Sequence, residues 1–372
     1  MRKYTILHTI ETAGPGGAET ILLNLASHLD SRRFRSVVLL PGSGWLHSQL
    51  QEAGVPAYVV RSNFWYDFRL PRAIAALARR EKADLIHSHL PDQNFYSSLV
   101  GRLMDRQVVV TYHGSQQLSK ADGLKCTLKL QIVRRAASAV VVVSDYLKEA
   151  LEKAGFPSKK IVRIYNGIEC GRFALPSQGN LRAELGCSNG TKLIGMVANV
   201  RDSKGYEHFV RAAQLVAMSM PQARFVAIGD VHSSTSSSLV SLRRELGLES
   251  RLSFVGFRSD VDRVLADLDV FVLSSISEGF SLATIEAMAA GKPVVVTRSG
   301  GPEEIVKDRV TGLLVPPADP PALAASICEL LNDPALASAL GQCAQAMVRN
   351  RFSLSEMIRE YTRVYERCLS ST

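Results

Sequence analysis

The segment Glu278-Gly-Phe-Ser-Leu-Ala-Thr-Ile-Glu286 sets two carboxylates eight residues apart, on either side of a Gly-Phe-Ser turn. The apolar run Val270–Leu273 comes before it, and a helical pattern that Gly291 closes comes after it. This order predicts a strand, a tight turn and the N-terminus of a helix. The free backbone N–H groups of the first helical turn and the positive end of the helix dipole then face one spot, which suits an anion.

The two glutamates suit the hydroxyl groups of a ligand, because carboxylates accept hydrogen bonds strongly and repel a bound anion. With phosphate at the turn, Glu286 lies roughly 6 Å beyond Leu282 along the helix, a distance that suits a ribose. A ligand that offers hydroxyls, phosphate and further hydroxyls is a nucleotide sugar. Two solvated glutamates are the alternative, but the apolar neighbours of Glu286 favour a carboxylate that has a partner.

Further glycine-rich and charged motifs follow one another in order along about 300 residues of the chain. They are Gly14-Pro-Gly-Gly-Ala-Glu19, His113-Gly114, Asn166-Gly167, Arg201-Asp-Ser-Lys204-Gly205 and Gly300-Gly-Pro-Glu-Glu-Ile-Val306. Together with the glutamate pair they resemble the signature of the retaining family-4 (group 1) glycosyltransferases, over essentially the whole chain. The resemblance implies the GT-B fold, in which two Rossmann-like α/β domains, each a parallel sheet with helices on both faces, face across a cleft.

Strand and helix patterns alternate in both halves of the chain, which independently predicts two parallel sheets covered by helices. We expect an N-terminal Rossmann-like, acceptor-side domain over residues 1–169 and a linker over 170–189, where Pro, Gly, Ser and Asn gather. A C-terminal Rossmann-like domain that binds the nucleotide sugar is expected over 190–350. A C-terminal helix over 351–372 is expected to pack back toward the N-terminal domain.

The cations Arg201 and Lys204 lie between an expected strand and an expected helix, next to Gly205. Such a loop can grip a diphosphate and stabilise the charge that grows on the leaving phosphate. A solvated surface loop is the alternative, but the resemblance places both cations at the phosphates. It also implies that His113 reaches the donor sugar beside the reacting carbon.

We expect Glu278 to hold the hydroxyls of the donor sugar and Glu286 to hold the ribose. The backbone N–H groups of the turn are expected to hold phosphate, and a residue after the run Phe254-Val-Gly-Phe257 is expected to contact the base. The resemblance adds a glycine loop near the start of the chain, facing donor phosphate or acceptor. The expected nucleotide-sugar contacts are those of Gly16, Gly17, Arg258, Phe280, Ser281, Leu282 and Glu286.

No cofactor and no essential metal are expected. Asp267-Leu268-Asp269 resembles the D-x-D of metal-dependent glycosyltransferases of a different fold, but it leads into the expected strand Val270–Leu273 and we interpret it as a chance match. His87 and His89 would share one face of a strand and could form a metal pair. No third ligand is evident from the sequence, so we interpret them as structural or acceptor-side residues.

The composition is that of a globular chain of two domains, with 372 residues, 46% hydrophobic and 21% charged. It contains no run of 18 apolar residues that could span a membrane, and the N-terminus lacks the pattern of a signal peptide. The six cysteines are scattered without a C-x-x-C pair, as is typical of reduced thiols. We therefore expect a cytoplasmic protein.

The positive charge is concentrated in the first half. Residues 1–165 hold 23 Lys and Arg against 13 Asp and Glu, whereas residues 166–372 hold 21 against 22. Two basic segments carry much of the excess, and Phe64-Trp-Tyr-Asp-Phe68 precedes the first. A basic surface with aromatic neighbours suits an anionic membrane on the inner face of the plasma membrane. A solvated face is the alternative, and we expect no nucleic-acid partner. The segments contain Arg69, Arg72, Arg79, Arg80 and Lys82, then Lys120, Lys125, Lys129, Arg134 and Arg135.

The predicted reaction is transfer of a hexosyl unit from a UDP- or GDP-sugar to an acceptor hydroxyl of a glycan or lipid-linked glycan, with retention at the anomeric carbon. Its predicted setting is cell-surface polysaccharide or glycolipid assembly. No residue stands out as a nucleophile, which agrees with the front-face attack proposed for the family. A sugar-nucleotide epimerase or hydrolase of similar fold, or a non-catalytic nucleotide-sugar binder, are the alternatives.

Overall fold

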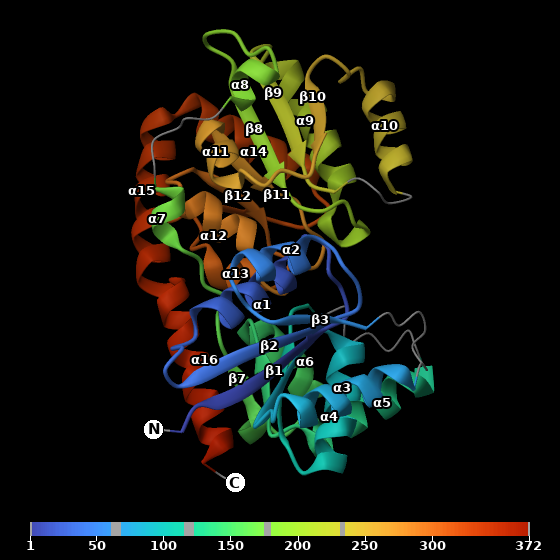
Figure 1. Ribbon diagram of the computed structural model, residues 1–372. Helices are drawn as coiled ribbons and strands as arrows, with labels where there is room; N and C mark the ends of the chain where they lie inside the picture. Colours follow the sequence, from blue (N-terminus) through green and yellow to red (C-terminus); the bar gives the residue numbers. More distant parts are fainter. Residues whose placement is uncertain (1, 61–67, 115–122, 175–179, 231–234, 371–372) are drawn as a thin grey trace. The chain divides into compact units, whose positions relative to one another are not determined.

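The computed structural model describes residues 2–60, 68–114, 123–174, 180–230 and 235–370, and the chain divides into two compact units (Figure 1). Unit 1 comprises Met1–Gly167 and Leu354–Thr372. Unit 2 comprises Ile168–Ser353. The C-terminal segment, red in Figure 1, is therefore part of the unit that the N-terminal segment begins.

Unit 1 is built on a parallel sheet in which seven strands are described, in the order β3-β2-β1-β4-β5-β6-β7. The chain moves outward from β1 to β3 and then returns to the other side of β1, so the strand order reverses between β1 and β4. In sheets of this kind ligands bind beyond the carboxyl ends of the strands, at the reversal. The strands are β1 (Tyr4–Ile10), β2 (Phe34–Leu40), β3 (Ala57–Val59), β4 (Leu85–His89), β5 (Gln107–Tyr112), β6 (Ala139–Val142) and β7 (Ile161–Arg163).

Helices pack against both faces of this sheet. The hydroxyls of Thr9 and Ser97 lie 2.9 Å apart and join β1 to α4 on one face. On the other face, the Tyr365 hydroxyl of α16 lies 2.7 Å from Nδ1 of His87, and Tyr361 and Thr111 are 3.3 Å apart. The helices are α1 (Gly17–His28), α2 (Trp45–Glu52), α3 (Arg69–Arg80), α4 (Pro91–Met104), α5 (Gly123–Ala136), α6 (Asp145–Lys153), η3 (Ser158–Lys160) and α16 (Leu354–Leu369).

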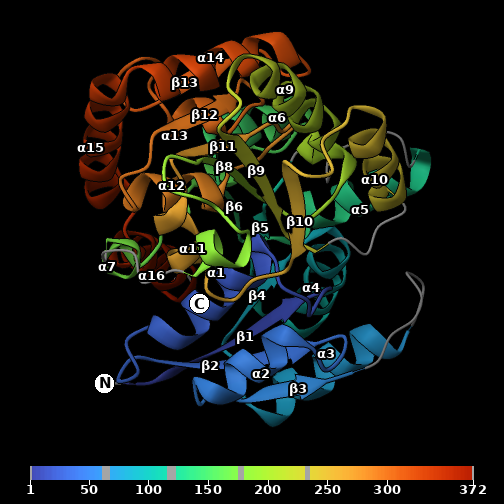
Figure 2. The same cartoon turned by 90° about the horizontal axis from the view of Figure 1, so that it is seen from above.

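Unit 2 repeats this arrangement with six described parallel strands in the order β10-β9-β8-β11-β12-β13, which Figure 2 shows side by side. Its reversal lies between β8 and β11. The core on one face joins Ile194 and Met196 of the sheet to Phe209 and Ile327 of the covering helices. The strands are β8 (Lys192–Val197), β9 (Ala223–Ile228), β10 (Leu252–Gly256), β11 (Val270–Leu273), β12 (Val294–Thr297) and β13 (Leu313–Val315).

The helices α9 and α14 cover that core, and α11 and α12 pack on the opposite face of the sheet (Figure 2). Aspartates cap the starts of α14 and α15. Asp319 accepts a hydrogen bond from the Ala322 N–H, and Asp333 accepts one from the Leu336 N–H, both at 2.9 Å. The helical segments are α7 (Cys170–Phe173), α8 (Leu181–Glu184), η4 (Asp202–Lys204), α9 (Tyr206–Ser219), α10 (Thr235–Glu245), α11 (Val261–Asp267), α12 (Leu282–Ala289), α13 (Pro302–Ile305), α14 (Pro320–Asn332) and α15 (Pro334–Arg351).

The predicted fold class of two parallel α/β sheets is confirmed. The segment predicted as a linker contains α7 and α8, and it is attached to unit 2 by the D-x-D carboxylates. The Leu181 N–H donates to Asp267 at 3.0 Å, and the Arg182 guanidinium forms an ion pair with Asp269. Both aspartates thus serve as structural acceptors in this unit.

The sequence did not predict β3, a short strand at the edge of the sheet whose residues are only half-buried. Most of the aromatic run Phe64-Trp-Tyr-Asp-Phe68 lies outside the described residues, as does Lys120. Across the described part of the chain, no helix combines the length and the apolar character needed to cross a membrane.

Candidate functional site

Three loops of unit 2 meet beyond the carboxyl ends of β8, β11 and β12. The Ile276 N–H donates to the Ser203 carbonyl at 2.8 Å, which joins the loop after β11 to the loop after β8. The Glu278 N–H donates to the Ser299 carbonyl at 2.9 Å, and the Gly301 N–H donates back to the Glu278 carbonyl at 2.9 Å. Glu278 is therefore held by its backbone between the two neighbouring loops.

Two glycines allow these loops to approach one another. Gly205 has φ +61°, and a Cβ there would lie 2.2 Å from the Ser274 carbonyl oxygen. A Cβ on Gly301 would lie 2.1 Å from the Gly279 carbonyl oxygen. Since backbone atoms cannot yield as a flexible side chain can, both positions require glycine.

The ammonium of Lys204 forms an ion pair with the carboxylate of Glu278. Both groups are largely withdrawn from solvent, with 22% and 10% of their side chains exposed. The Ser275 hydroxyl also donates to Glu278, at 3.4 Å. The structure thus brings together two residues that the sequence analysis assigned to one site. Arg201 precedes η4 and is exposed, and within the described ranges its guanidinium forms no ion pair.

The predicted helix N-terminus is present at α12. The Ser281 hydroxyl accepts from the Thr284 N–H at 3.2 Å and caps the helix. The N–H groups of Ser281 and Leu282 donate to no other described residue, as expected at the first turn of a helix. Phe280 is buried, and its ring packs edge-on against Phe352 at 5.6 Å between centroids. Its side chain therefore packs inside unit 2.

Glu286 lies one turn further along α12. Burial of its carboxyl raises its pKa to about 7, while Arg172 acts to lower it and Asp262 to raise it. Arg172 itself is paired with Asp262 at 3.0 Å. At neutral pH Glu286 is thus close to the midpoint of its titration, and a hydroxyl donor would favour the ionised form.

Arg258, predicted to contact a base, is fully engaged within unit 2. Its guanidinium donates to Glu184 at 2.7 Å and to both carboxylate oxygens of Asp260 at 2.8 Å. It follows β10, which β9 and β8 separate from β11. The structure does not join Arg258 to the Lys204 and Glu278 pair, and its contact with a base stays a prediction.

The glycine loop of unit 1 begins α1. Gly16 is the residue before the helix and Gly17 is its first residue. A Cβ on Gly16 would lie 2.3 Å from Oε2 of Glu19, and Oε1 of the same carboxylate accepts a hydrogen bond from the Thr12 hydroxyl. The carboxylate of Glu19 therefore already lies at this helix start.

His113 follows β5 in unit 1, as predicted. Its Nε2 lies 3.0 Å from Nδ1 of His89, and the two rings stack with centroids 5.2 Å apart. Desolvation lowers the pKa of His113 to about 4, so its imidazole is neutral at physiological pH.

Glu11, directly after β1, was missed by the sequence analysis. It accepts a hydrogen bond from the Asp92 N–H at 2.9 Å, and Asp92 is paired with Lys129 at 2.5 Å. Burial, together with the charge of Asp92, raises the pKa of Glu11 to about 7. Its place after the first strand, at the reversal of strand order, is the signal that could have identified it.

Family models match nearly the whole chain. Residues 177–347 match the model described as "Glycosyl transferases group 1", and residues 15–172 match "Glycosyltransferase Family 4". These two ranges fall largely in unit 2 and unit 1, respectively.

Individual proteins show the same relationship. The chain is 27% identical over 305 residues to N-acetyl-alpha-D-glucosaminyl L-malate synthase of Bacillus anthracis, covering 81% of this chain and 79% of that protein. It is 25% identical over 334 residues to the Escherichia coli UDP-Gal:alpha-D-GlcNAc-diphosphoundecaprenol alpha-1,3-galactosyltransferase, covering 87% and 86%. The crystal structure of Anabaena HepE in complex with UDP-glucose matches with a TM-score of 0.89 and 25% identity, covering 97% of this chain and 99% of that one. The expected GT-B fold is thereby confirmed.

Replacing Gly301 with alanine should disturb the Glu278 loop, because the new methyl group overlaps the Gly279 carbonyl. We expect Gly301→Ala to lower the free energy of unfolding of unit 2 by about 1–3 kcal/mol. Hydrogen exchange of the core amides of unit 2 would measure the change. Gly171→Ala is the matched control, since a Cβ there meets no atom within 4 Å. Equal hydrogen-exchange protection of the core amides in the two variants would show that the close approach of Gly301 to the Gly279 carbonyl does not constrain the loop.

Proposed function

The chain belongs to the group 1, family 4 glycosyltransferases, and we propose that it transfers a hexosyl unit from a UDP-sugar to an acceptor hydroxyl with retention at the anomeric carbon. The observation that carries the proposal is the convergence of Lys204, Glu278 and the free N–H groups of α12 at the reversal of the unit 2 sheet. The choice of UDP is supported by HepE, whose structure holds UDP-glucose, and by the E. coli relative, whose name specifies UDP-Gal.

The donor phosphates would lie at the start of α12. There the N–H groups of Ser281 and Leu282 are available, and the helix dipole is favourable. Lys204 and the exposed Arg201 would supply positive charge as the leaving phosphate departs. These cations take the part that a divalent ion plays in other glycosyltransferases, so we expect equal turnover with and without added Mg²⁺ or Mn²⁺.

The carboxylates would hold hydroxyl groups on either side of the phosphates. Glu278 is fixed by its backbone and would accept from the donor sugar, and Glu286 would accept from the ribose. Because the Glu278 carboxylate is already paired with Lys204, it is a poor nucleophile. Retention would then follow from attack on the same face that the phosphate leaves, with the leaving phosphate taking the proton of the acceptor hydroxyl. His113 of unit 1 is assigned to the donor sugar by the family resemblance.

The acceptor is proposed to be a glycan or a lipid-linked glycan, as in cell-surface polysaccharide or glycolipid assembly. In unit 1 the carboxylate of Glu19 lies at the start of α1, where it would repel a phosphate. This loop with Gly16 and Gly17 therefore suits acceptor hydroxyls better than donor phosphate.

Lys204→Ala should lower turnover by two or more orders of magnitude, because one preorganised donor to the developing charge contributes roughly 3–4 kcal/mol. Turnover would be measured with UDP-linked hexoses, after a thermal-shift screen of UDP- and GDP-sugars that identifies the donor. Lys307→Ala, at an exposed lysine of unit 2, is the control. Near-normal turnover in Lys204→Ala would contradict the proposed site. Thermal stabilisation by GDP-sugars alone would contradict the proposed donor.

The affinity for UDP-glucose should fall as pH decreases below 7. Glu286 binds a proton in the free protein with a pKa of about 7, and a ribose hydroxyl donates better to the ionised carboxylate. Affinity should therefore weaken by up to about tenfold per pH unit below that value. Calorimetry between pH 5.5 and 8.5 would measure it, in a range where the diphosphate of UDP-glucose keeps its charge. Glu286→Gln should make the affinity independent of pH in this range, and the control Glu245→Gln, at an exposed glutamate, should not. If the wild type and both variants share the same pH dependence, Glu286 is not its source.

We also propose that unit 1 contacts an anionic membrane surface on the cytoplasmic side, through α3. The helix buries Leu70, Ile74 and Leu77, whereas Arg72 and Arg79 are exposed, and Phe68 before it is 74% exposed.

The second basic segment supports this contact less than the sequence suggested. Lys129 is paired with Asp92, and Arg134 donates to the Gly155 carbonyl at 3.2 Å. Both cations are therefore already used within unit 1.

The double variant Arg72→Glu and Arg79→Glu should bind anionic vesicles at least roughly tenfold more weakly, because each cation near the surface contributes about 1 kcal/mol. Co-sedimentation at low salt would measure the binding, and rising salt should release the wild type. The control reverses Lys307 and Arg349, which are exposed in unit 2. If the wild type stays in solution at every salt concentration, α3 is an ordinary solvated face.

A further inference from the structure

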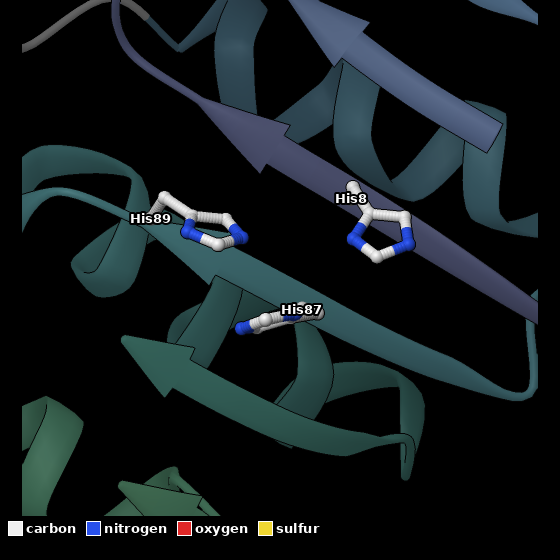
Figure 3. Close-up of side chains that lie close together, drawn as sticks. All are labelled: His8, His87 and His89. Atoms are coloured by element: carbon white, nitrogen blue, oxygen red, sulfur yellow. The ribbon is translucent and has the colours of Figure 1, made fainter. Parts of the chain in front are cut away.

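Three histidines lie together inside unit 1, on the face of the sheet that α16 covers. His8 of β1 is paired in register with His87 of β4, and His89 follows two residues later on the same face of β4. All three side chains are fully buried. Figure 3 shows the rings on one side of the two strands, with ring nitrogens of His8 and His89 turned toward each other.

The ring nitrogens are close enough to share one ion. One nitrogen from each histidine can be chosen so that all three lie within 4.8 Å of one another. The ring centroids of His87 and His89 are 4.3 Å apart, and those of His8 and His87 are 5.5 Å apart. A small inward movement of the rings would therefore place three nitrogens around a single centre.

Several of these nitrogens have no hydrogen-bond partner. Both ring nitrogens of His8 and Nε2 of His89 are buried without a partner among the described residues. A buried polar group left unpaired is costly, and such groups in native proteins call for a ligand or another explanation. One of the unpaired nitrogens of His8 is turned toward His89 (Figure 3).

We propose that His8, His87 and His89 bind one divalent transition-metal ion of the zinc class. Neutral imidazoles are the usual nitrogen ligands of such ions, whereas magnesium and calcium prefer oxygen. Burial keeps the rings neutral, since it lowers the pKa of His8 to about 3 and the pKa of His87 and His89 well below the usual value. A set of three histidines leaves the fourth position of a tetrahedral ion open.

The hydrogen bonds around the cluster fit this assignment. Nδ1 of His87 lies 2.7 Å from the Tyr365 hydroxyl, and Nε2 lies 2.8 Å from the Thr111 hydroxyl. His87 would exchange one of these contacts for the ion and keep the other, as metal-bound histidines are commonly oriented by a hydrogen bond from the second nitrogen. His89 would bind through Nε2, because its Nδ1 is directed at His113.

The ion would thereby fix the tautomer of a candidate catalytic residue. With Nε2 of His89 on the metal, the proton of His89 is on Nδ1 and is donated to Nε2 of His113 across 3.0 Å. His113 then carries its own proton on Nδ1. The metal would act as a positioning group for His113.

The test needs no enzyme activity, so its failure is distinct from failure of the proposed function. The full-length protein is dialysed against Zn²⁺ alone and then against metal-free buffer, and its zinc content is measured. We expect about one zinc per chain, and X-ray absorption should show three imidazole nitrogens at about 2.0–2.1 Å. Cobalt in place of zinc should give the visible absorption of a tetrahedral site.

His8→Gln should lower the zinc affinity on the order of 100-fold or more, since even second-shell losses cost 10–100-fold. His28→Gln, at an exposed histidine of α1 in the same unit, should bind zinc as the wild type does. Unchanged zinc binding in a folded His8→Gln protein would overturn the proposal. If that variant fails to fold, the absorption spectrum of the wild type decides, and either no bound zinc or sulfur ligands from the cysteines would refute the site.

Discussion

The close approach of three backbone loops at Gly205 and Gly301 is the constraint on which the unit 2 site depends. A Cβ at Gly205 or Gly301 would lie 2.2 or 2.1 Å from a carbonyl oxygen, respectively, which is far inside van der Waals contact. Because these loops touch, Lys204 after β8 can pair with Glu278 after β11. The reversal of strand order brings those two loops to the same edge of the sheet. The strand order of the unit 2 sheet, the two glycines and the ion pair of Lys204 with Glu278 are thus parts of one arrangement.

The sheet of unit 1 has the same reversal of strand order, but different side chains lie beside it. Its corresponding loops carry the carboxylates Glu11, Glu19 and Asp92, whereas the loops of unit 2 join Lys204 to Glu278 beside the free N–H groups of α12. The two reversals therefore present different charged groups, although the two sheets follow the same strand order.

The fold could largely be predicted from the sequence, because apolar strands such as Val270–Leu273 are buried on both faces and alternate with capped helices. The edge strand β3 was missed, since its half-buried residues carry little periodic signal. In the unit 2 site, the proximity of Lys204 and Glu278 could be predicted, because the two residues lie in the loops that follow the neighbouring strands β8 and β11. The ion pair of Arg258 with Glu184 could not be predicted, because Glu184 lies in the segment predicted as a linker, whose packing within unit 2 has no pattern in the sequence. His8 was likewise missed as a neighbour of His87, since strand register is a tertiary property.

The chain crosses from unit 1 to unit 2 at Gly167–Ile168 and returns at Ser353–Leu354. The two crossing segments pair with each other, as the Ile168 N–H donates to the Phe352 carbonyl at 2.9 Å. During synthesis all of unit 2 is therefore translated before α16. Until then the sheet of unit 1 lacks Tyr361 and Tyr365, the partners of Thr111 and His87. Unit 1 is therefore begun before unit 2, but it can be completed only after unit 2 has been translated.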